Sequence, residues 1–147
     1  MTELSITVPG TPVPQGSKRI VSSRGRSGRA WMIDANDSTL RPWRATVTAA
    51  AIAAITPGWV TSGAFQVFTQ FHLARPKSHY GAKGVLPSRS GAEHAQKPDL
   101  DKLCRAVLDS LTDAGVWRDD SQVYHLHATK LWAVEHPLLT VRVWGDS

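Results

Sequence analysis

The stretch from 97 to 120, KPDLDKLCRAVLDSLTDAGVWRDD, constrains the fold more than any other part of this chain. Its apolar residues recur at intervals of three and four, and its charged residues take the other side, so the pattern predicts an amphipathic helix over 99–114. Gly115 is well placed as its C-terminal cap. Such a helix needs an apolar surface to cover, and the remaining sequence has to supply it.

Alternating apolar residues predict strands that supply this surface, at 3–8, 64–73, 122–132 and 138–144. Residues 135–137 are predicted to form the turn of a hairpin between the last two. A second helix is predicted from Ser38 or Thr39 to about Ile55. The chain of 147 residues has the size of one domain, so we expect a single domain over 1–147. The order of elements predicts an α+β (mixed α/β) fold, with a mixed β-sheet of about four strands packed by two main helices.

Two polar stretches, at about 10–37 and 75–97, show no hydrophobic period, and we interpret them as long basic loops. Residues 14–36 and 75–97 each carry five basic residues against one acidic residue, within a chain whose net charge is +5. The remainder of the chain is therefore acidic. This distribution favours a polyanion held by the two loops, although a soluble basic protein with solvated loops has the same pattern.

Cysteine content and the N-terminus bear on the compartment. Cys104 is the only cysteine, so no intramolecular disulfide is possible, and its apolar neighbours predict a buried, reduced thiol. The first residues, MTELSITVPG, resemble no secretory signal, and no window is apolar enough for a membrane span. We therefore expect a cytoplasmic protein with no membrane partner, and we find no motif for an organic cofactor.

Four carboxylates stand at the two ends of the predicted helix, Asp99 and Asp101 at its start and Asp119 and Asp120 after its end. They have two explanations. Carboxylates accept hydrogen bonds from free amides at a helix start, and acidic pairs are common in turns. If the strand after Asp120 runs beside the helix start, three of these residues instead form the oxygen donor set that suits Mg²⁺ or Mn²⁺, an ion that activates water and stabilises phosphoryl charge.

The pattern D-L-D-K-L-x-R-A-x-L-D-x-L-x-x-A-G-x-W-x-D-D-x-Q-V, completed by Lys130, resembles the RusA family of Holliday-junction resolvases of bacteria and their phages. The resemblance spans about residues 97–130, and VPGTPVPQGSKR near the N-terminus is similar to phage-type members. It implies a RusA-like homodimeric endodeoxyribonuclease, encoded by a phage or prophage and acting in the cytoplasm of a bacterial host. It also implies paired nicks in opposing strands of branched DNA.

The resemblance also implies site residues. Asp99, Asp101 and Asp120 would coordinate Mg²⁺ or Mn²⁺, with Asp119 as a fourth candidate. Arg105 stands where the family pattern has a functional lysine, and arginine clamps phosphate but does not readily donate a proton. Arg105 and Lys130 would stabilise negative charge on the phosphate. DNA-binding candidates are Lys18, Arg19, Arg24, Arg26, Arg29, Arg75, Lys77, Lys97 and Lys102.

Some alternatives remain open at this stage. His125 and His127 share a strand face and form either a metal pair or solvent-facing or phosphate-contacting residues. Trp31 is either a stacking platform for an unpaired base or a core residue, and Trp117 is interpreted as a packing residue that fixes the turn before Asp119. Besides junction resolution, a nuclease that prefers flaps or forks and a non-catalytic basic DNA-binding protein both fit the charge pattern.

Overall fold

The computed structural model describes residues 2–16, 18–22, 30–34 and 37–146, and the DNA-binding candidates Arg24, Arg26 and Arg29 lie outside these ranges. Four strands form one mixed sheet in the order β1-β8-β4-β7, in which β4 and β7 are parallel and the other pairs are antiparallel. The strands are β1 (Thr2–Pro9), β4 (Ala64–Leu73), β7 (Val123–Trp132) and β8 (Leu138–Asp146). The predicted α+β fold is confirmed.

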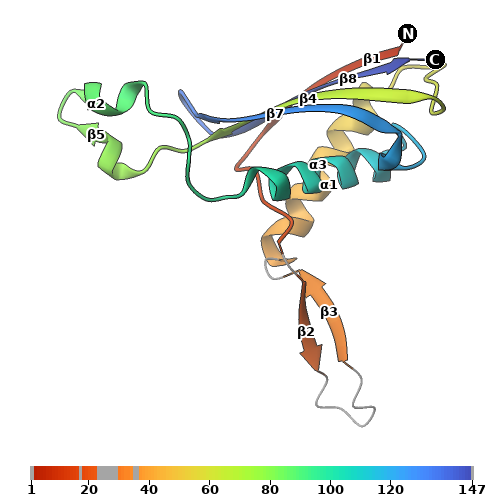
Figure 1. Cartoon of the computed structure of the whole chain (residues 1–147), viewed down its shortest axis with the longest axis horizontal. Helices are drawn as coiled ribbons and strands as arrows, with labels where there is room; N and C mark the ends of the chain where they lie inside the picture. Colours follow the sequence, from red (N-terminus) through yellow and green to blue (C-terminus); the bar gives the residue numbers. More distant parts are fainter. Residues whose placement is uncertain (1, 17, 23–29, 35–36, 147) are drawn as a thin grey trace.

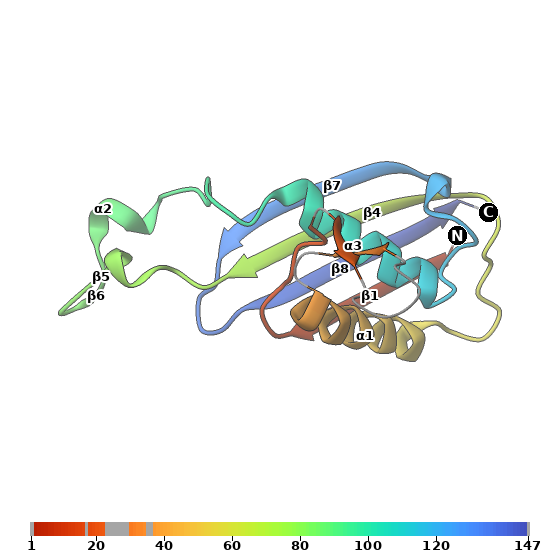
Figure 2. The ribbon, with the colours of Figure 1, turned by 90° about the horizontal axis from the view of Figure 1, so that it is seen from below.

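Two helices, α1 (Asp37–Ala54) and α3 (Leu100–Asp113), cover the same face of this sheet (Figures 1 and 2). Both helices bury residues at the predicted helical spacing. In α1 the buried side chains are Leu40, Trp43, Val47 and Ala51, and in α3 they are Leu103, Cys104, Ala106, Val107, Ser110 and Leu111. No helix among the described residues is long and apolar enough to cross a membrane.

The alternation of each strand divides its side chains between the helix-covered face and an open face. Ile6, Val141 and Thr69 are register partners across three neighbouring strands, and all three are buried under the helices. On the open face, Phe68 stacks on His127 with ring centroids 5.0 Å apart and meets His125 at 5.7 Å. The prediction that the two histidines share a strand face is therefore confirmed.

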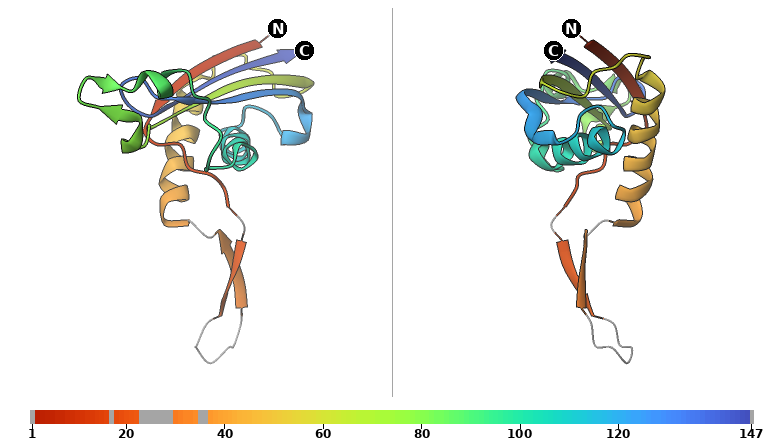
Figure 3. Two further views of the ribbon diagram at one scale, coloured as in Figure 1. Left: turned by 60° about the vertical axis from the view of Figure 1, so that its left-hand side comes forward. Right: turned by 90° about the vertical axis from the view of Figure 1, so that its right-hand side faces the viewer.

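The prediction that the stretch at 10–37 is one long loop is wrong. The stretch contains an antiparallel hairpin of β2 (Lys18–Ser22) and β3 (Ala30–Asp34). The hairpin projects away from the sheet (Figures 1 and 3). Lys18 and Arg19 lie on β2, and Trp31 lies on β3. Two apolar runs of only a few residues, set among Gly, Ser and Arg, were too short to show a strand period.

The second stretch, residues 75–97, which we call the arm, also contains short elements and projects beyond the ends of β4 and β7 (Figure 2). These are η1 (Lys77–His79), β5 (Tyr80–Gly81), β6 (Gly84–Val85) and α2 (Pro87–Ser90). Their lengths of two to four residues are below what periodicity detects.

The predicted hairpin between the last two strands is wrong. Although β7 and β8 follow one another in the chain, β4 lies between them in the sheet and pairs with both. Residues 135–137 therefore belong to a connection that passes the end of β4, where the Ala133 amide donates to the Leu73 carbonyl. Strand boundaries were readable from the sequence, but strand neighbours depend on tertiary packing.

The turn after α3 is built as predicted. Gly115 has φ +82, a left-handed conformation that glycine adopts without strain, and the Val116 amide closes the helix end by donating to the Leu111 carbonyl. Trp117 is buried, with its ring centroid 5.4 Å from that of Phe65, and its indole N–H donates to the Thr112 hydroxyl. The interpretation of Trp117 as the packing residue of this turn is confirmed.

Candidate active site

A groove runs along β7 on the helix-covered side of the sheet. Leu126, Ala128, Lys130 and Trp132 point to this side, because they are register partners of the buried side of β4. α3 covers them only in part, and two cavities of about 660 and 760 Å³ remain, which share Leu100 and Ala128. The four side chains of β7 therefore line one continuous groove.

In a regular strand Tyr124 would lie on the same face as Leu126, but in the structure it does not line the groove. The register with β4 shifts between Phe65 and Gln66, where the partners skip from Val123 to His125, so Tyr124 is the extra residue of a bulge. Its hydroxyl donates to Asp146 instead. Leu126 keeps 40 % of its surface exposed because the groove above it is open.

Three charged residues from two segments line one cavity at one end of the groove. Asp101 and Arg105 come from successive turns of α3, and Asp120 comes from η2 (Asp120–Gln122), and all three line the same cavity. α3 and β7 run in opposite directions, so the turn between them returns Asp120 to the helix. Among the described residues, the Arg105 guanidinium has no hydrogen bond or ion pair.

Asp99 stands apart from this group. It occupies the N-cap position of α3, but its side chain makes no capping hydrogen bond, so the prediction that it caps the helix is wrong. The carboxylate instead accepts a hydrogen bond from the Lys102 ammonium at 3.2 Å, and both side chains are substantially exposed. A surface ion pair of this kind is worth about 0–1 kcal/mol, so little free energy holds Asp99 in this rotamer.

As the described side chains stand, no three His, Cys, Asp or Glu residues are grouped so that they could hold a metal ion. Asp101 and Asp120 nevertheless line one cavity, and Asp99 is two residues before Asp101 in the chain. Carboxylate oxygens are the donors that Mg²⁺ prefers. The donor chemistry fits the ion, with Asp101 and Asp120 lining one cavity and Asp99 turned toward Lys102.

Asp119 has a structural task. Its carboxylate accepts the Ser121 amide at 3.0 Å, and the Gln122 side chain accepts the Asp119 amide at 3.0 Å, which together form a capping box. The hydrogen bond from the Ser121 amide, followed by one from Asp120, lowers the pKa of Asp119. Its predicted role as a fourth metal ligand stays a prediction.

The pKa of Asp120 is shifted in the opposite direction to that of Asp119. Desolvation raises its pKa most, followed by the hydrogen bond with Asp119 and by the negative charges of Asp119 and Asp109. The ionised form of Asp120 is therefore disfavoured in the protein alone, and a nearby cation would relieve this cost. Asp120 is the carboxylate that capping and turn chemistry explain least.

Three polar residues near the site were missed by the sequence reasoning. Asp109 lies two turns after Asp101 on α3, and its carboxylate accepts a hydrogen bond from the Gln15 amide group at 2.8 Å. The backbone amide of Gln15 donates to the Lys102 carbonyl, so the segment that leads into β2 is fastened along α3. The spacing of Asp101, Arg105 and Asp109 by four residues was the available signal, whereas nothing in the sequence pointed to Gln15.

The third missed residue is Gln122, whose side-chain amide donates to the carbonyls of Thr61 and Gly63 at 2.9 Å. This side chain ties the turn that carries Asp120 to the start of β4. The Asp-x-x-Gln spacing at 119–122 is a readable capping-box signal.

Cys104 also lines the acidic cavity. Burial, followed by the charge of Asp101, raises the pKa of its thiol to about 11. The thiol is therefore protonated at neutral pH and is a poor nucleophile. The predicted buried, reduced cysteine is confirmed as buried and free.

Lys130 lies in the middle of the groove and faces the backbone of the segment before α3. Its ammonium donates to the carbonyls of Gln96 and Pro98, the latter at 2.9 Å. These carbonyls immediately precede Asp99, so Lys130 fastens the end of the arm to β7. A contact between Lys130 and a phosphate stays a prediction, and in this structure two of its three donors are already used.

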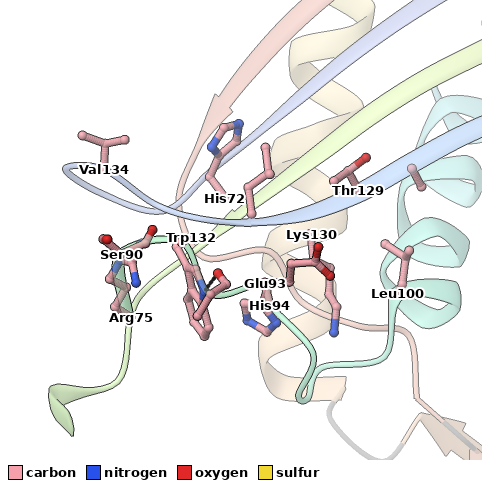
Figure 4. Close-up of a pocket in the computed structure, with 14 residues that line it drawn as sticks. His72, Arg75, Ser90, Glu93, His94, Leu100, Thr129, Lys130, Trp132 and Val134 are labelled. Carbon is pink, nitrogen blue, oxygen red and sulfur yellow. Dashed lines mark hydrogen bonds between the residues drawn. The ribbon is translucent and has the colours of Figure 1, made fainter. Parts of the chain in front are cut away.

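The far end of the groove is formed by aromatic and basic residues of the arm and β7. Figure 4 shows Trp132, His94 and Lys130 on one side of β7 and His72 on the other. The Trp132 ring lies 4.1 Å from that of His94, and its indole N–H donates to the Ala92 carbonyl at 2.9 Å. The arm is thus held against the end of β7.

Arg75 is turned into the arm. Its guanidinium donates to the carbonyls of Arg89 and Ser90 and lies 5.6 Å from the centre of the Trp132 ring. The other DNA-binding candidates within the arm, Lys77 and Lys97, are exposed. Contact between these residues and DNA stays a prediction, as it does for Lys102, which pairs with Asp99.

No curated protein matches the chain. A family model described as Endodeoxyribonuclease RusA matches residues 9–144, which covers all of the elements that build the groove. The chain belongs to the RusA endodeoxyribonuclease family.

Proposed function

We propose that this protein is a Mg²⁺-dependent endodeoxyribonuclease that resolves Holliday junctions by paired nicks in opposing strands. Membership of the RusA family implies endodeoxyribonuclease activity on such junctions. The observation that carries the finer proposal is that Asp101, Arg105 and Asp120 line one cavity. The two carboxylates suit a cation, and the free guanidinium suits a phosphate that the same cation would contact.

Asp101 and Asp120 would hold Mg²⁺, or Mn²⁺, and Asp99 would join them by leaving Lys102. When bound, such an ion lowers the pKa of a coordinated water and neutralises charge on the phosphoryl group. Arg105 clamps the phosphate in two hydrogen bonds and stabilises its growing negative charge, and because it remains protonated it does not protonate the leaving group. Lys130 holds the segment before Asp99 in place.

Basic segments on both sides of the groove would hold the DNA. The β2–β3 hairpin and the arm project from the core in different directions, with the helix-covered side of the sheet between them (Figure 1). Lys18 and Arg19 lie on the hairpin, and the arm adds Lys77 and Lys97. Contacts of this kind go to phosphates and not to base edges, so affinity should fall steeply with salt concentration.

Paired nicks require two copies of the site, and we propose that a homodimer supplies them. The open face of the sheet is our candidate interface, because no helix of the described ranges covers it and Phe68 on it keeps 38 % of its surface exposed. In analytical ultracentrifugation we expect a dimer for the wild type and a monomer for Phe68→Asp. A more exposed apolar residue on α1, Ile52, provides the control as Ile52→Asp, which should remain dimeric.

The activity is tested with a labelled four-way junction in Mg²⁺, beside matched flap and fork substrates. We expect symmetric cuts in opposing strands of the junction and slower cutting of the flap and fork. Asp120→Asn should not cut, whereas Asp113→Asn should cut normally, because Asp113 lies at the end of α3 and is paired with Arg44 outside the groove. Faster cutting of flaps would favour a flap nuclease, and binding without cutting at any Mg²⁺ or Mn²⁺ concentration would favour a non-catalytic DNA-binding protein.

A further inference from the structure

The tip of the arm carries three exposed apolar side chains in a basic surrounding. Tyr80, Val85 and Leu86 keep 48 %, 38 % and 36 % of their surfaces exposed, and we call these three residues the arm tip. Tyr80 and Val85 are register partners of the β5–β6 pair, so their side chains lie on the same face. An exposed apolar group of this kind needs a physical reason, since water solvates it poorly.

The backbone presents the arm tip in a defined conformation. A Cβ atom at Gly81 would lie only 2.8 Å from the Leu86 side chain, so Leu86 packs directly on the Gly81 backbone. The Leu86 amide donates to the His79 carbonyl at 2.8 Å, and His79 is buried beneath the tip. Leu86 is therefore held against the hairpin of the tip.

The base of the arm is braced as well. Arg75 joins its two sides by donating to the carbonyls of Arg89 and Ser90, and the Trp132 indole joins it to β7 through Ala92. The edge of the His79 ring meets Trp132 at 4.9 Å. A braced projection loses less conformational entropy on insertion into a ligand than a loose loop does.

The charges around the arm tip select the kind of ligand. Lys77, Lys83 and Arg89 are exposed, and none of them has a hydrogen bond or ion pair from its side chain to another described residue. Glu93 is the only acidic residue of the arm. Apolar side chains among free cations match a nucleic acid, whose phosphates attract the cations and whose bases accept apolar wedges between them.

We propose that the arm tip inserts Tyr80 and Leu86 between base pairs at the branch point of a DNA junction, while Lys83 and Arg89 hold the neighbouring phosphates. The inference rests on the proposed function, because it concerns the same substrate. The arm begins at the far end of the groove, beyond Trp132, and extends away from the acidic cavity (Figure 2). The tip thus engages the junction at a point separate from the cleaved phosphate.

The test uses a four-way junction that carries 2-aminopurine at the branch point and the Asp120→Asn protein, which should leave the junction uncut. At saturating protein, unstacking should raise the 2-aminopurine fluorescence. Tyr80→Ser and Leu86→Ser should each lose at least half of this rise, whereas Tyr80→Phe, which keeps the ring, and Ile52→Ser, a control on α1, should keep it. Circular dichroism of each variant shows whether it is folded.

The double variant Lys83→Ala, Arg89→Ala should behave differently. Its affinity should fall, and the slope of log affinity against log salt should decrease by about 2, since two phosphate contacts are lost. At saturation its fluorescence should equal that of the parent protein. Separate effects of the apolar and basic substitutions would show that the arm tip unstacks bases and that the cations hold phosphates.

Several outcomes would overturn the inference. The first is that the parent protein gives no fluorescence rise, and the second is that Tyr80→Ser and Leu86→Ser give an undiminished rise. The third is that the tip variants change only the sedimentation of the free protein and not the fluorescence of the junction, which would indicate that the arm tip binds a protein. Cutting by the wild type is measured in parallel. Normal cutting without tip-dependent unstacking refutes this inference alone, whereas tip-dependent unstacking without cutting refutes the proposed nuclease and leaves the inference standing.

Discussion

The charged residues at the two ends of the groove along β7 differ in whether other groups of the protein compensate their charge. At the acidic end, Asp120 has a raised pKa and Arg105 has no partner among the described residues. At the arm end, Arg75 donates to backbone carbonyls, and Trp132 packs against His79 and His94. Uncompensated charge is costly in a folded protein and marks the end that binds a ligand, whereas compensated charge marks the end that holds the chain in place.

The largest expected effect comes from the acidic end. Asp120→Asn removes a carboxylate from the cavity but keeps its size, and we expect junction cleavage to fall by about 10³-fold. Single-turnover cleavage in Mg²⁺ measures the effect, with Asp113→Asn as the control. If both variants cleave at the wild-type rate, the distinction between the two ends of the groove is not the one proposed.

Asp120→Asn should not be less stable than the wild type. Because the pKa of Asp120 is raised by folding, the protonated form is favoured in the folded state, and its contribution to stability is lost as the pH rises through the folded pKa. At pH 7 the ionised carboxylate therefore costs stability, and the neutral asparagine does not. Thermal unfolding of the metal-free proteins should give an equal or higher midpoint for the variant, and a lower one would assign the loss of cleavage to misfolding.

Lys130 lies between the two ends of the groove. Its substitution distinguishes a positioning role from a direct contact with phosphate. Lys130→Met should release the carbonyls of Gln96 and Pro98 and let the segment before Asp99 move, so cleavage should fall by about 10–100-fold. A positioning role predicts that the Mg²⁺ concentration for half-maximal cleavage rises and that excess Mg²⁺ restores part of the rate. A loss that is independent of Mg²⁺ would favour a direct phosphate contact, and Arg41→Met on α1 is the control.

At the arm end we expect loss of stability first. Trp132→Ala removes the ring that joins β7 to the arm, and since Trp132 is half-buried we expect about 2 kcal/mol of destabilisation in denaturant unfolding. Val134→Ala is the matched control, because Val134 is 95 % exposed on the connection after β7 and should change little. Equal effects of the two substitutions would mean that the arm is not held by Trp132.

The smallest expected effect is a pH dependence of the arm end. Burial, then the charge of Lys130, lowers the pKa of His94, so its neutral form is favoured in the folded state. Its contribution to stability is present above the unfolded pKa of about 6.5 and is lost as the pH falls below it. Between pH 7.5 and 5.5 the thermal midpoint should therefore fall less in His94→Gln than in the wild type, while His136→Gln, in an exposed connection, should follow the wild type.

Sequence patterns predicted the parts of this molecule that depend on local periodicity. The helix over 99–114, the capping glycine at 115 and the four strands of the sheet were all readable, because each buries one regular stripe or face. The residues of the acidic end were readable too, since the RusA-like pattern of Asp101, Arg105 and Asp120 is local in sequence.

Features that depend on neighbours across the fold were not readable. Asp99 was expected to cap α3, but Lys102 competes for its carboxylate. The partners of Lys130 are carbonyls about thirty residues away, and only the pairing of β4 with β7 brings them within reach. Residue types do not specify which backbone groups approach them, so the architecture of the arm end had to come from the structure.

The position of β8 between β1 and β4 has a consequence for the folding of this protein. Thr2 pairs with Gly145, so the sheet joins segments at opposite ends of the described chain, and β4 pairs with β7 across the whole arm and α3. Such long-range pairing is slow to form, because distant segments have to meet before any contact stabilises them. A chain still emerging from the ribosome lacks β8 and cannot complete this sheet. We therefore expect the groove along β7 to form only after synthesis has passed β8.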